Sequence, residues 1–216
     1  MMPLNFNVNA RGELKILCIG AHSDDIEIGC GGTILRLAEQ YPGCEFHWVV
    51  FNAIGKREIE ARRAAQLFAG SRLVSASLMT FQDGFMPYIG GEVKATFEND
   101  LKRLSPDLIF THSGDDAHQD HRLISQLTWN TFRDHFILEY EIPKYDGDLG
   151  RPSIFVPLDR KICETKVEYL MNAFQSQQTK RWFQPDIFFS LMRLRGMECA
   201  APGGYAEGFY CRKLVL

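Results

Sequence analysis

Hydrophobic positions along the first two-thirds of the chain follow two alternating patterns. Short runs of apolar and β-branched residues are typical of buried strands, whereas apolar residues at helical spacing are typical of amphipathic helices. The runs predict strands at residues 14–19, 45–51, 73–80 and 108–111, and the helical spacing predicts helices at residues 33–41, 58–69, 93–104 and 120–133. Because strand and helix alternate regularly, we expect an α/β fold of three layers, with a mostly parallel sheet between helices.

The last third of the chain is less regular. Its pattern predicts strands at residues 136–142, 153–156 and 209–215, and helices at residues 161–174 and 182–195. The length of 216 residues suits one domain. We therefore expect a single domain over residues 1–216, in which regular βα units occupy residues 1–135 and residues 136–216 complete the sheet and the pocket.

Composition and charge argue against several classes of protein. Hydrophobic residues make up 45% of the chain, as in globular proteins with a full core. The formal net charge is −3 without a long run of Lys and Arg, which argues against a nucleic-acid or anionic-membrane surface. Residues 1–12 lack the layout of a signal peptide and no apolar run could cross a bilayer, so we expect a cytoplasmic location. The six cysteines form no C-x-x-C pair, which predicts reduced, buried thiols rather than a zinc ribbon.

Polar side chains gather in two segments that follow strands of the predicted sheet. Residues 21–33 come directly after the first strand, and residues 111–122 follow the fourth. The glycines within residues 29–32 predict a tight turn before the helix expected from residue 33. Each segment alone is equally typical of a turn or a helix cap, and Asp120 in particular suits a cap. Because ligands bind beyond the carboxyl ends of parallel strands, the two segments together favour a functional site.

The residue types in these segments are those of a hydrolytic metal site. Imidazole and carboxylate groups are good ligands for zinc and similar ions, and a catalytic zinc needs about three protein ligands and one open position for water. The first segment offers His22 and one carboxylate, because the neighbouring Asp24 and Asp25 should point in different directions. One of them can then bind metal while the other acts as a base towards the water, and the second segment supplies the third ligand.

Residues 21–33 (AHSDDIEIGCGGT), together with residues 118–122 (HQDHR), resemble the motifs of the LmbE-like or PIG-L de-N-acetylase family. Residues 204–209 (GYAEGF) are similar to a C-terminal segment of the same family. Its members are metal-dependent deacetylases with a Rossmann-like α/β sheet that act on N-acetylglucosamine-type glycans. The sequence departs from the family pattern at Ser23, where Pro is usual, and at Ile26, where Glu is frequent; neither change removes an expected ligand.

The resemblance implies a role for each polar residue of the two segments. The implied metal ligands are His22, Asp25 and His121. Asp24 would be the general base, and His118, oriented by Asp120, would stabilise the oxyanion or act as an acid. Zinc is the expected cofactor, and Fe²⁺ and Co²⁺ also suit these ligands. The implied reaction hydrolyses the acetamide of an N-acetylated amino sugar to acetate and a free amine.

Five further residues are candidates for substrate binding: Arg57, Asp83, His112, Asp116 and Glu207. Arg57 and Asp83 could hydrogen-bond to sugar hydroxyls or a phosphate, although a surface charge and a turn residue explain them equally well. His112 and Asp116 belong to the second polar segment, where they could line the pocket. Glu207 could brace the site from the C-terminal segment, or be a plain surface carboxylate.

Three other functions fit parts of the pattern. Two His and one carboxylate also form the site of non-haem iron oxygenases, but those enzymes use an all-β scaffold. A nucleotide-binding or methyl-transfer domain would need G-x-G-x-x-G directly after the first strand, or a P-loop lysine, and this chain has neither. A non-catalytic sugar-binding relative is disfavoured because all the expected catalytic residues are present. The expected partner is a small-molecule amino sugar or glycan conjugate, not nucleic acid, and a homo-oligomer is left open.

Overall fold

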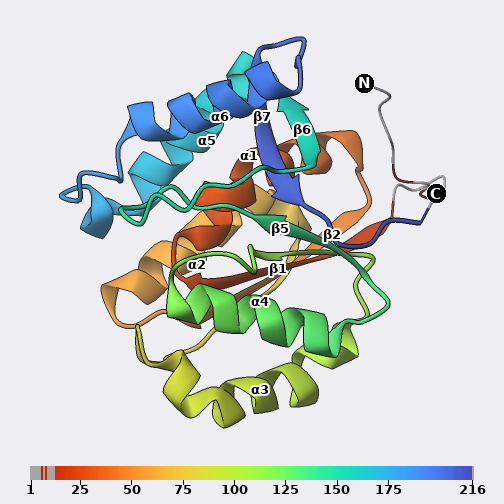
Figure 1. Cartoon of the computed structure of the whole chain (residues 1–216), viewed down its shortest axis with the longest axis vertical. Helices are drawn as coiled ribbons and strands as arrows, with labels where there is room; N and C mark the ends of the chain where they lie inside the picture. The colour runs from red at the N-terminus through yellow and green to blue at the C-terminus, as the bar shows by residue number, and fades with distance from the viewer. Residues whose placement is uncertain (1–5, 7, 9–12, 216) are drawn as a thin grey trace.

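The computed structural model describes residues 6, 8 and 13–215, and over this range the chain forms a mixed sheet between layers of helices (Figure 1). Most of residues 1–12, on which the expected absence of a signal peptide rests, lie outside the described residues. The described strands are β1 (Leu14–His22), β2 (Cys44–Asn52), β3 (Leu73–Leu78), β4 (Leu108–His112), β5 (Phe136–Tyr140), β6 (Ile154–Leu158) and β7 (Tyr205–Tyr210). The helices are α1 (Asp25–Gln40), α2 (Lys56–Ala69), α3 (Gly90–Asn99), α4 (Gln119–Thr131), α5 (Arg160–Ala173) and α6 (Pro185–Glu198).

The strands lie in the order β3-β2-β1-β4-β5-β7-β6. The first five pair in parallel, and β7 is antiparallel to both of its neighbours, which confirms the predicted α/β fold with a mostly parallel sheet. The chain runs outward from β1 to β3 on one side and then returns to β4 on the other side of β1. The order therefore reverses between β1 and β4, and such a switch point creates a ligand crevice at the carboxyl ends of the two strands.

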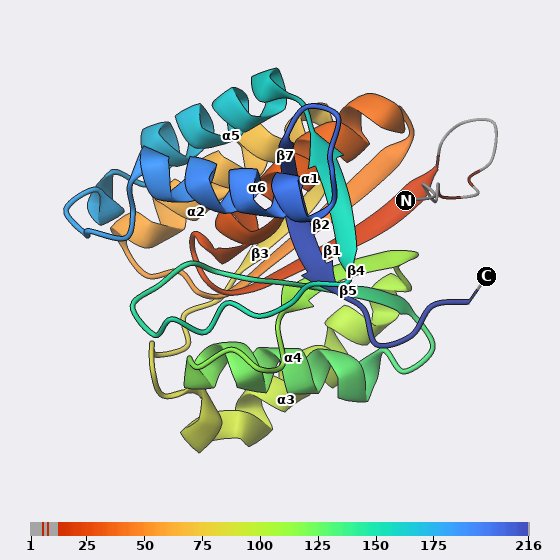
Figure 2. The same ribbon diagram turned by 45° about the horizontal axis from the view of Figure 1, so that its top comes forward.

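Side chains of the central strands enter two separate cores. Ile16 and Cys18 of β1 pack into one core, while Leu17 and Ile19 enter the other, as the two-residue period of a strand requires. The first core contains residues of α1, α2, α5 and α6, and the second contains residues of α3 and α4. Figure 2 shows α3 and α4 on one side of the sheet and the other helices on the opposite side. Burial on both faces explains the consecutive apolar runs in the sequence.

The predicted start of the first helix is wrong, because α1 begins at Asp25 rather than near residue 33. The glycines that predicted a turn lie inside this helix, around a kink where the backbone of Cys30 is not helical, and they allow close packing. A Cβ on Gly29 would overlap the ring of Tyr140, and one on Gly31 would lie 2.6 Å from Phe68. These glycines therefore bring the helix backbone against neighbouring side chains.

Some of the other boundaries also differ from the prediction. The segment between the strand expected at 73–80 and the helix expected at 93–104 contains a 3₁₀ turn, Met86–Ile89. The expected helix itself is α3 followed by a second 3₁₀ turn, Leu101–Leu104. The strand expected at 209–215 is β7, which ends at Tyr210. Its Gly and Glu residues have low strand propensity, but pairing with β5 and β6 on both sides outweighs that preference. The remaining elements are confirmed to within about three residues of their predicted ends.

Two further predictions concern the cysteines and membrane spans. All six cysteines fall within the described residues and are unpaired, with five of them buried and Cys211 partly exposed. Among the described helices, none combines the length and apolar character needed to cross a bilayer.

Candidate functional site

Three potential ligands meet where β1 and β4 end. His22 is the last residue of β1, Asp25 begins α1, and His121 lies in the first turn of α4. The distance from His22 Nδ1 to His121 Nε2 is 3.1 Å, and Asp25 Oδ2 lies 3.5 Å from each of these nitrogens. Ligands placed tetrahedrally at about 2.0–2.1 Å from a zinc ion are separated by about 3.3 Å. These three residues, the ligand cluster below, therefore have the spacing that a divalent cation requires.

The outer nitrogen of each imidazole in the ligand cluster faces a carboxylate. His22 Nε2 lies 3.0 Å from Asp83 Oδ1 and 3.2 Å from Asp120 Oδ2, and His121 Nδ1 lies 3.0 Å from Asp116 Oδ2. Metal-binding histidines usually donate their second N–H to such a carboxylate, which directs the lone pair of the other nitrogen at the ion. The surroundings of the ligand cluster therefore support its interpretation as a metal centre.

The charges around the ligand cluster also suit a cation. Burial raises the pKa of Asp25, but the neighbouring His121 and His112 lower it well below its ordinary value, so the carboxylate stays ionised. Burial and then His112 lower the pKa of His121, which keeps a lone pair available. Burial also lowers the pKa of His22, yet hydrogen bonds to carboxylates, led by Asp120, raise it well above the ordinary value. Carboxylates that attract a proton at this position attract a metal ion for the same reason.

Asp24 lies beside the ligand cluster with a different partner. Its Oδ1 accepts a hydrogen bond from Arg57 Nη2 at 2.6 Å. Its Oδ2 is buried and has no hydrogen-bond partner among residues 13–215. The two adjacent aspartates thus point in different directions: Asp25 faces the two histidines, and Asp24 keeps one carboxylate oxygen without a hydrogen-bond partner among the described residues.

His118 is the N-cap of α4, and its hydrogen bond at this position determines which ring nitrogen carries the proton. Its Nδ1 accepts a hydrogen bond from the backbone N–H of Asp120 at 3.2 Å, so the neutral ring carries its proton on Nε2. Burial and then the neighbouring His121 lower the pKa of His118, which favours the neutral ring. Its ring centroid lies 4.8 Å from that of His22. His118 is therefore placed beside the ligand cluster as a neutral hydrogen-bond donor.

The carboxylate of Asp120 contacts His22 and two backbone N–H groups rather than His118. It accepts hydrogen bonds from the backbone N–H groups of Gly84 at 2.7 Å and Met86 at 3.2 Å, and it faces His22. The residue orients His118 through its backbone N–H alone. The predicted orientation of His118 by Asp120 therefore rests on the backbone N–H of Asp120, while the carboxylate of Asp120 faces His22.

Two of the five substrate-binding candidates lie at the open side of the cluster. Asp83 faces His22 while its side chain is 69% exposed. Arg57 is partly exposed, and its guanidinium holds Asp24. Both side chains have donor or acceptor atoms near the ligand cluster, so they stay candidates for substrate contact.

The other three candidates are buried, which argues against the expected substrate contacts. His112 is fully buried, stacks on His121 with centroids 3.9 Å apart, and lies 3.2 Å from Asp25. Asp116 is buried against His121. Glu207 accepts hydrogen bonds from the backbone N–H groups of residues 32 and 33 and pairs with Lys166 at 2.7 Å.

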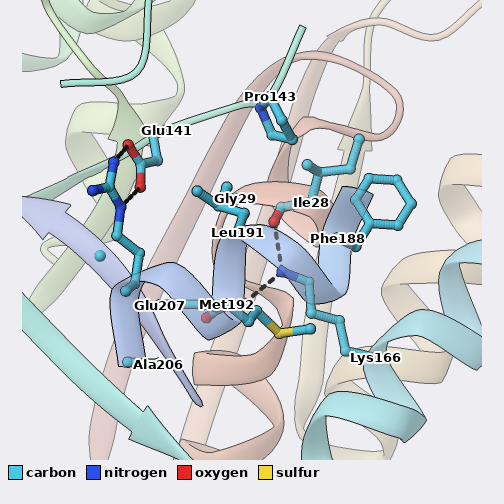
Figure 3. A pocket seen from close by; sticks show the side chains of 12 residues that line it. Ile28, Gly29, Glu141, Pro143, Lys166, Phe188, Leu191, Met192, Ala206 and Glu207 are labelled. Carbon is cyan, nitrogen blue, oxygen red and sulfur yellow. Dashed lines mark hydrogen bonds and ion pairs between the residues drawn. The ribbon is translucent and has the colours of Figure 1, made fainter. Parts of the chain in front are cut away.

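Figure 3 shows how Lys166 extends from α5 to Glu207 and to the carbonyl of Ile28. These contacts connect α1, α5 and β7. Glu207 therefore connects α1 to α5 and β7, which agrees with the bracing contact that the sequence left open rather than with a contact to substrate.

An ion pair and a pair of exposed aromatic rings close to the ligand cluster are not among the predicted site residues. Lys144, in the connection between β5 and β6, pairs with Asp116 at 2.9 Å. Phe85 and Tyr88 are 50% and 81% exposed and follow Asp83 directly, with their rings 6.0 Å apart. Nothing in the irregular segment around Lys144 indicates its contact, whereas Phe85 and Tyr88 lie between a predicted strand and a predicted helix, where exposed aromatic residues can mark a binding surface.

Comparison with known proteins places the chain in a family. Residues 17–132, more than half of the chain, match the family model of PIG-L, described as GlcNAc-PI de-N-acetylase. The uncharacterized deacetylase YaiS of Escherichia coli K12 is 30% identical over 141 residues, which cover 59% of this chain and 74% of that protein.

Solved structures with the same fold differ in activity. The N,N'-diacetylchitobiose deacetylase of Pyrococcus horikoshii is 22% identical with a TM-score of 0.70, and the match covers 91% of this chain and 83% of that one. GalB of Pseudomonas putida KT2440, a 4-carboxy-2-hydroxymuconate hydratase, is 18% identical with a TM-score of 0.72, covering 94% and 98% of the two chains. At such identities the likeness shows the fold alone, whereas the family model spans both β1 and α4 of the ligand cluster. The chain belongs to the PIG-L, or GlcNAc-PI de-N-acetylase, family of amide-bond hydrolases.

Proposed function

We propose that this protein is a divalent-metal hydrolase that removes the acetyl group from an N-acetylated amino sugar and releases acetate and a free amine. The observation that carries the proposal is the ligand cluster, with donor atoms 3.1–3.5 Å apart beside the free carboxylate oxygen of Asp24. Zinc is the proposed ion, and Fe²⁺ or Co²⁺ suits the same ligands. When bound, the ion would polarise the amide carbonyl and lower the pKa of a water molecule.

The residues around the ligand cluster have complementary tasks in amide hydrolysis. Asp24 accepts a proton from the attacking water through Oδ2, because Oδ1 is occupied by Arg57. His118 donates its Nε2–H to the carbonyl oxygen as negative charge develops there. Asp24 then delivers the proton to the leaving nitrogen, so that a C–O bond forms and the C–N bond breaks.

Several features support an amino sugar or glycan conjugate as the substrate. The family is described by its action on an N-acetylglucosamine lipid, and the structural relative from Pyrococcus horikoshii acts on diacetylchitobiose. Asp83 and Arg57 offer hydrogen bonds to hydroxyl groups at the open side of the site. Phe85 and Tyr88 offer exposed aromatic faces, on which the C–H face of a sugar ring can pack. A cytoplasmic location, expected from the sequence, is part of the same proposal.

Phe85 and Tyr88 are expected to contact the sugar unit next to the acetamido sugar, and so to contribute to substrate affinity rather than to catalysis. Backbone N–H groups on both sides of Phe85 bind Asp120, so this segment has a fixed position beside the site. Replacing both residues by Ala should raise KM for an N-acetylated disaccharide roughly threefold to tenfold, with kcat and the monosaccharide KM nearly unchanged. Steady-state kinetics on both sugars measure this effect. Val74→Ala, on the exposed edge strand β3, is the matched control, and equal changes for both sugars would contradict the prediction.

The proposed function is tested by metal analysis of the purified protein together with acetate release from a panel of N-acetylated sugars. About one bound ion per chain and metal-dependent acetate release are expected. A metal-loaded protein that releases no acetate from any sugar would favour a non-catalytic relative. Addition of water to an unsaturated dicarboxylate, without acetate release, would instead indicate the chemistry of the hydratase with the same fold.

A further inference from the structure

Lys144 is held by oxygen atoms on several sides. It lies in the connection between β5 and β6, and its side chain is only 12% exposed. Its Nζ donates to Asp116 Oδ2 at 2.9 Å and to the carbonyl of Ile142 at 3.4 Å, and it lies 2.5 Å from Asp148 Oδ2. Two hydrogen bonds and an ion pair with Asp148 therefore hold this long side chain in one conformation.

The carboxylate of Asp116 connects Lys144 to the ligand cluster. Its Oδ2 faces both the ammonium group of Lys144 and the Nδ1 of His121, at 2.9 and 3.0 Å. Its Oδ1 accepts a hydrogen bond from the backbone N–H of His118 at 2.8 Å. The oxygen that orients the ligand His121 is thus also the one that Lys144 holds.

The connection that carries Lys144 is itself fixed at both ends. Arg195 of α6 is buried and donates to both carboxylate oxygens of Glu141 at 2.6 and 2.7 Å, a pair of contacts that Figure 3 shows at Glu141. The same guanidinium donates to the carbonyl of Gly150 at 3.1 Å. Asp148 accepts a hydrogen bond from the backbone of Ala117 at 2.7 Å, next to Asp116. Lys144 therefore belongs to a rigid support of the site.

We propose that Lys144 is a positioning residue for the metal centre: by holding Asp116 it keeps His121 directed at the ion and strengthens metal binding. This inference rests on the proposed metal-dependent function. The charge of Lys144 alone would act in the opposite direction, because a cation close to the site repels a divalent ion. Removal of Lys144 therefore separates the two effects: binding weakens if the residue positions Asp116 and tightens if only its charge matters.

The test compares zinc affinity of the metal-free full-length protein and of Lys144→Met by competition with a chromophoric chelator. Replacement of groups around metal ligands typically weakens binding 10–100-fold, and we expect a dissociation constant about tenfold higher. Lys144→Arg should restore most of the affinity, because a guanidinium can also bridge two carboxylates. Lys161→Met, at an exposed position of α5, is the matched control and should bind zinc like the wild type.

The outcomes separate this inference from the proposed function. Wild-type affinity or tighter binding in Lys144→Met would overturn the positioning role while leaving the metal centre intact. A wild-type protein that binds none of zinc, iron or cobalt would overturn the metal centre itself. If Lys144→Met does not fold, Asp148→Ala provides the second measurement, since it keeps the charge of Lys144 and removes the carboxylate that pairs with it. A threefold loss of zinc affinity is expected there, and unchanged affinity would contradict the proposal.

Discussion

Replacement of Asp24 by Asn is expected to reduce kcat by about a hundredfold to ten-thousandfold while metal content stays at the wild-type level. The amide is nearly the same size as the carboxylate, and its oxygen can still accept the hydrogen bond from Arg57. It cannot accept a proton from water at neutral pH. The ligand cluster contains Asp25 rather than Asp24, so metal binding should not depend on this change.

Turnover of the best sugar substrate and metal content per chain are the two measurements for Asp24→Asn. Asp83→Asn is a useful comparison, because Asp83 also lies by the ligand cluster but is largely exposed. We expect that variant to lose far less kcat than Asp24→Asn. Deacetylation by Asp24→Asn at the wild-type rate would show that another group is the base.

The ligand cluster could be predicted from the sequence because it depends on few structural facts. Parallel strands present their carboxyl ends at one edge, where His22 ends β1 and His121 lies shortly after β4, the neighbour of β1 in the sheet. The alternation of strand and helix predicted the parallel sheet, whereas the choice of His22, Asp25 and His121 came from the resemblance of residues 21–33 and 118–122 to the family motifs. The start of α1 was not predictable in the same way, because Gly29 and Gly31 favour turns locally, and only their packing against Tyr140 and Phe68 explains a helix.

The residues that support the ligands were harder to predict, because their roles depend on side-chain direction rather than on sequence position. Asp120 follows His118 closely in the chain, yet its carboxylate turns to His22 because two backbone N–H groups of residues 84–86 bind it there. Glu207 lies in a family-like segment but is directed at the middle of α1. Lys144 reaches Asp116 from a connection that Arg195 contacts at both ends. These contacts are long-range in sequence, and periodicity carries no information about them.

Loss of His121 is expected to remove both metal binding and activity. His121→Ala leaves the ligand cluster with one imidazole and one carboxylate, fewer than the roughly three protein ligands of a catalytic zinc. Because an ion contributes several kcal/mol to transition-state stabilisation, activity should fall by at least about a thousandfold. His135→Ala is the matched control, since His135 directly precedes β5, at the opposite end of the parallel strands from the ligand cluster, and this variant should keep metal and activity.

Thermal unfolding with and without a chelator gives an independent measurement of the same ligand. An ion present at about a thousandfold above its dissociation constant stabilises the folded state by about 4 kcal/mol. For a chain of this size, removal of the ion should lower the Tm of the wild type by roughly 8–16 °C. His121→Ala should unfold at the same temperature with or without chelator, because it has no ion to lose. A variant that still held one ion per chain, and still lost stability on chelation, would show that His121 is not a ligand.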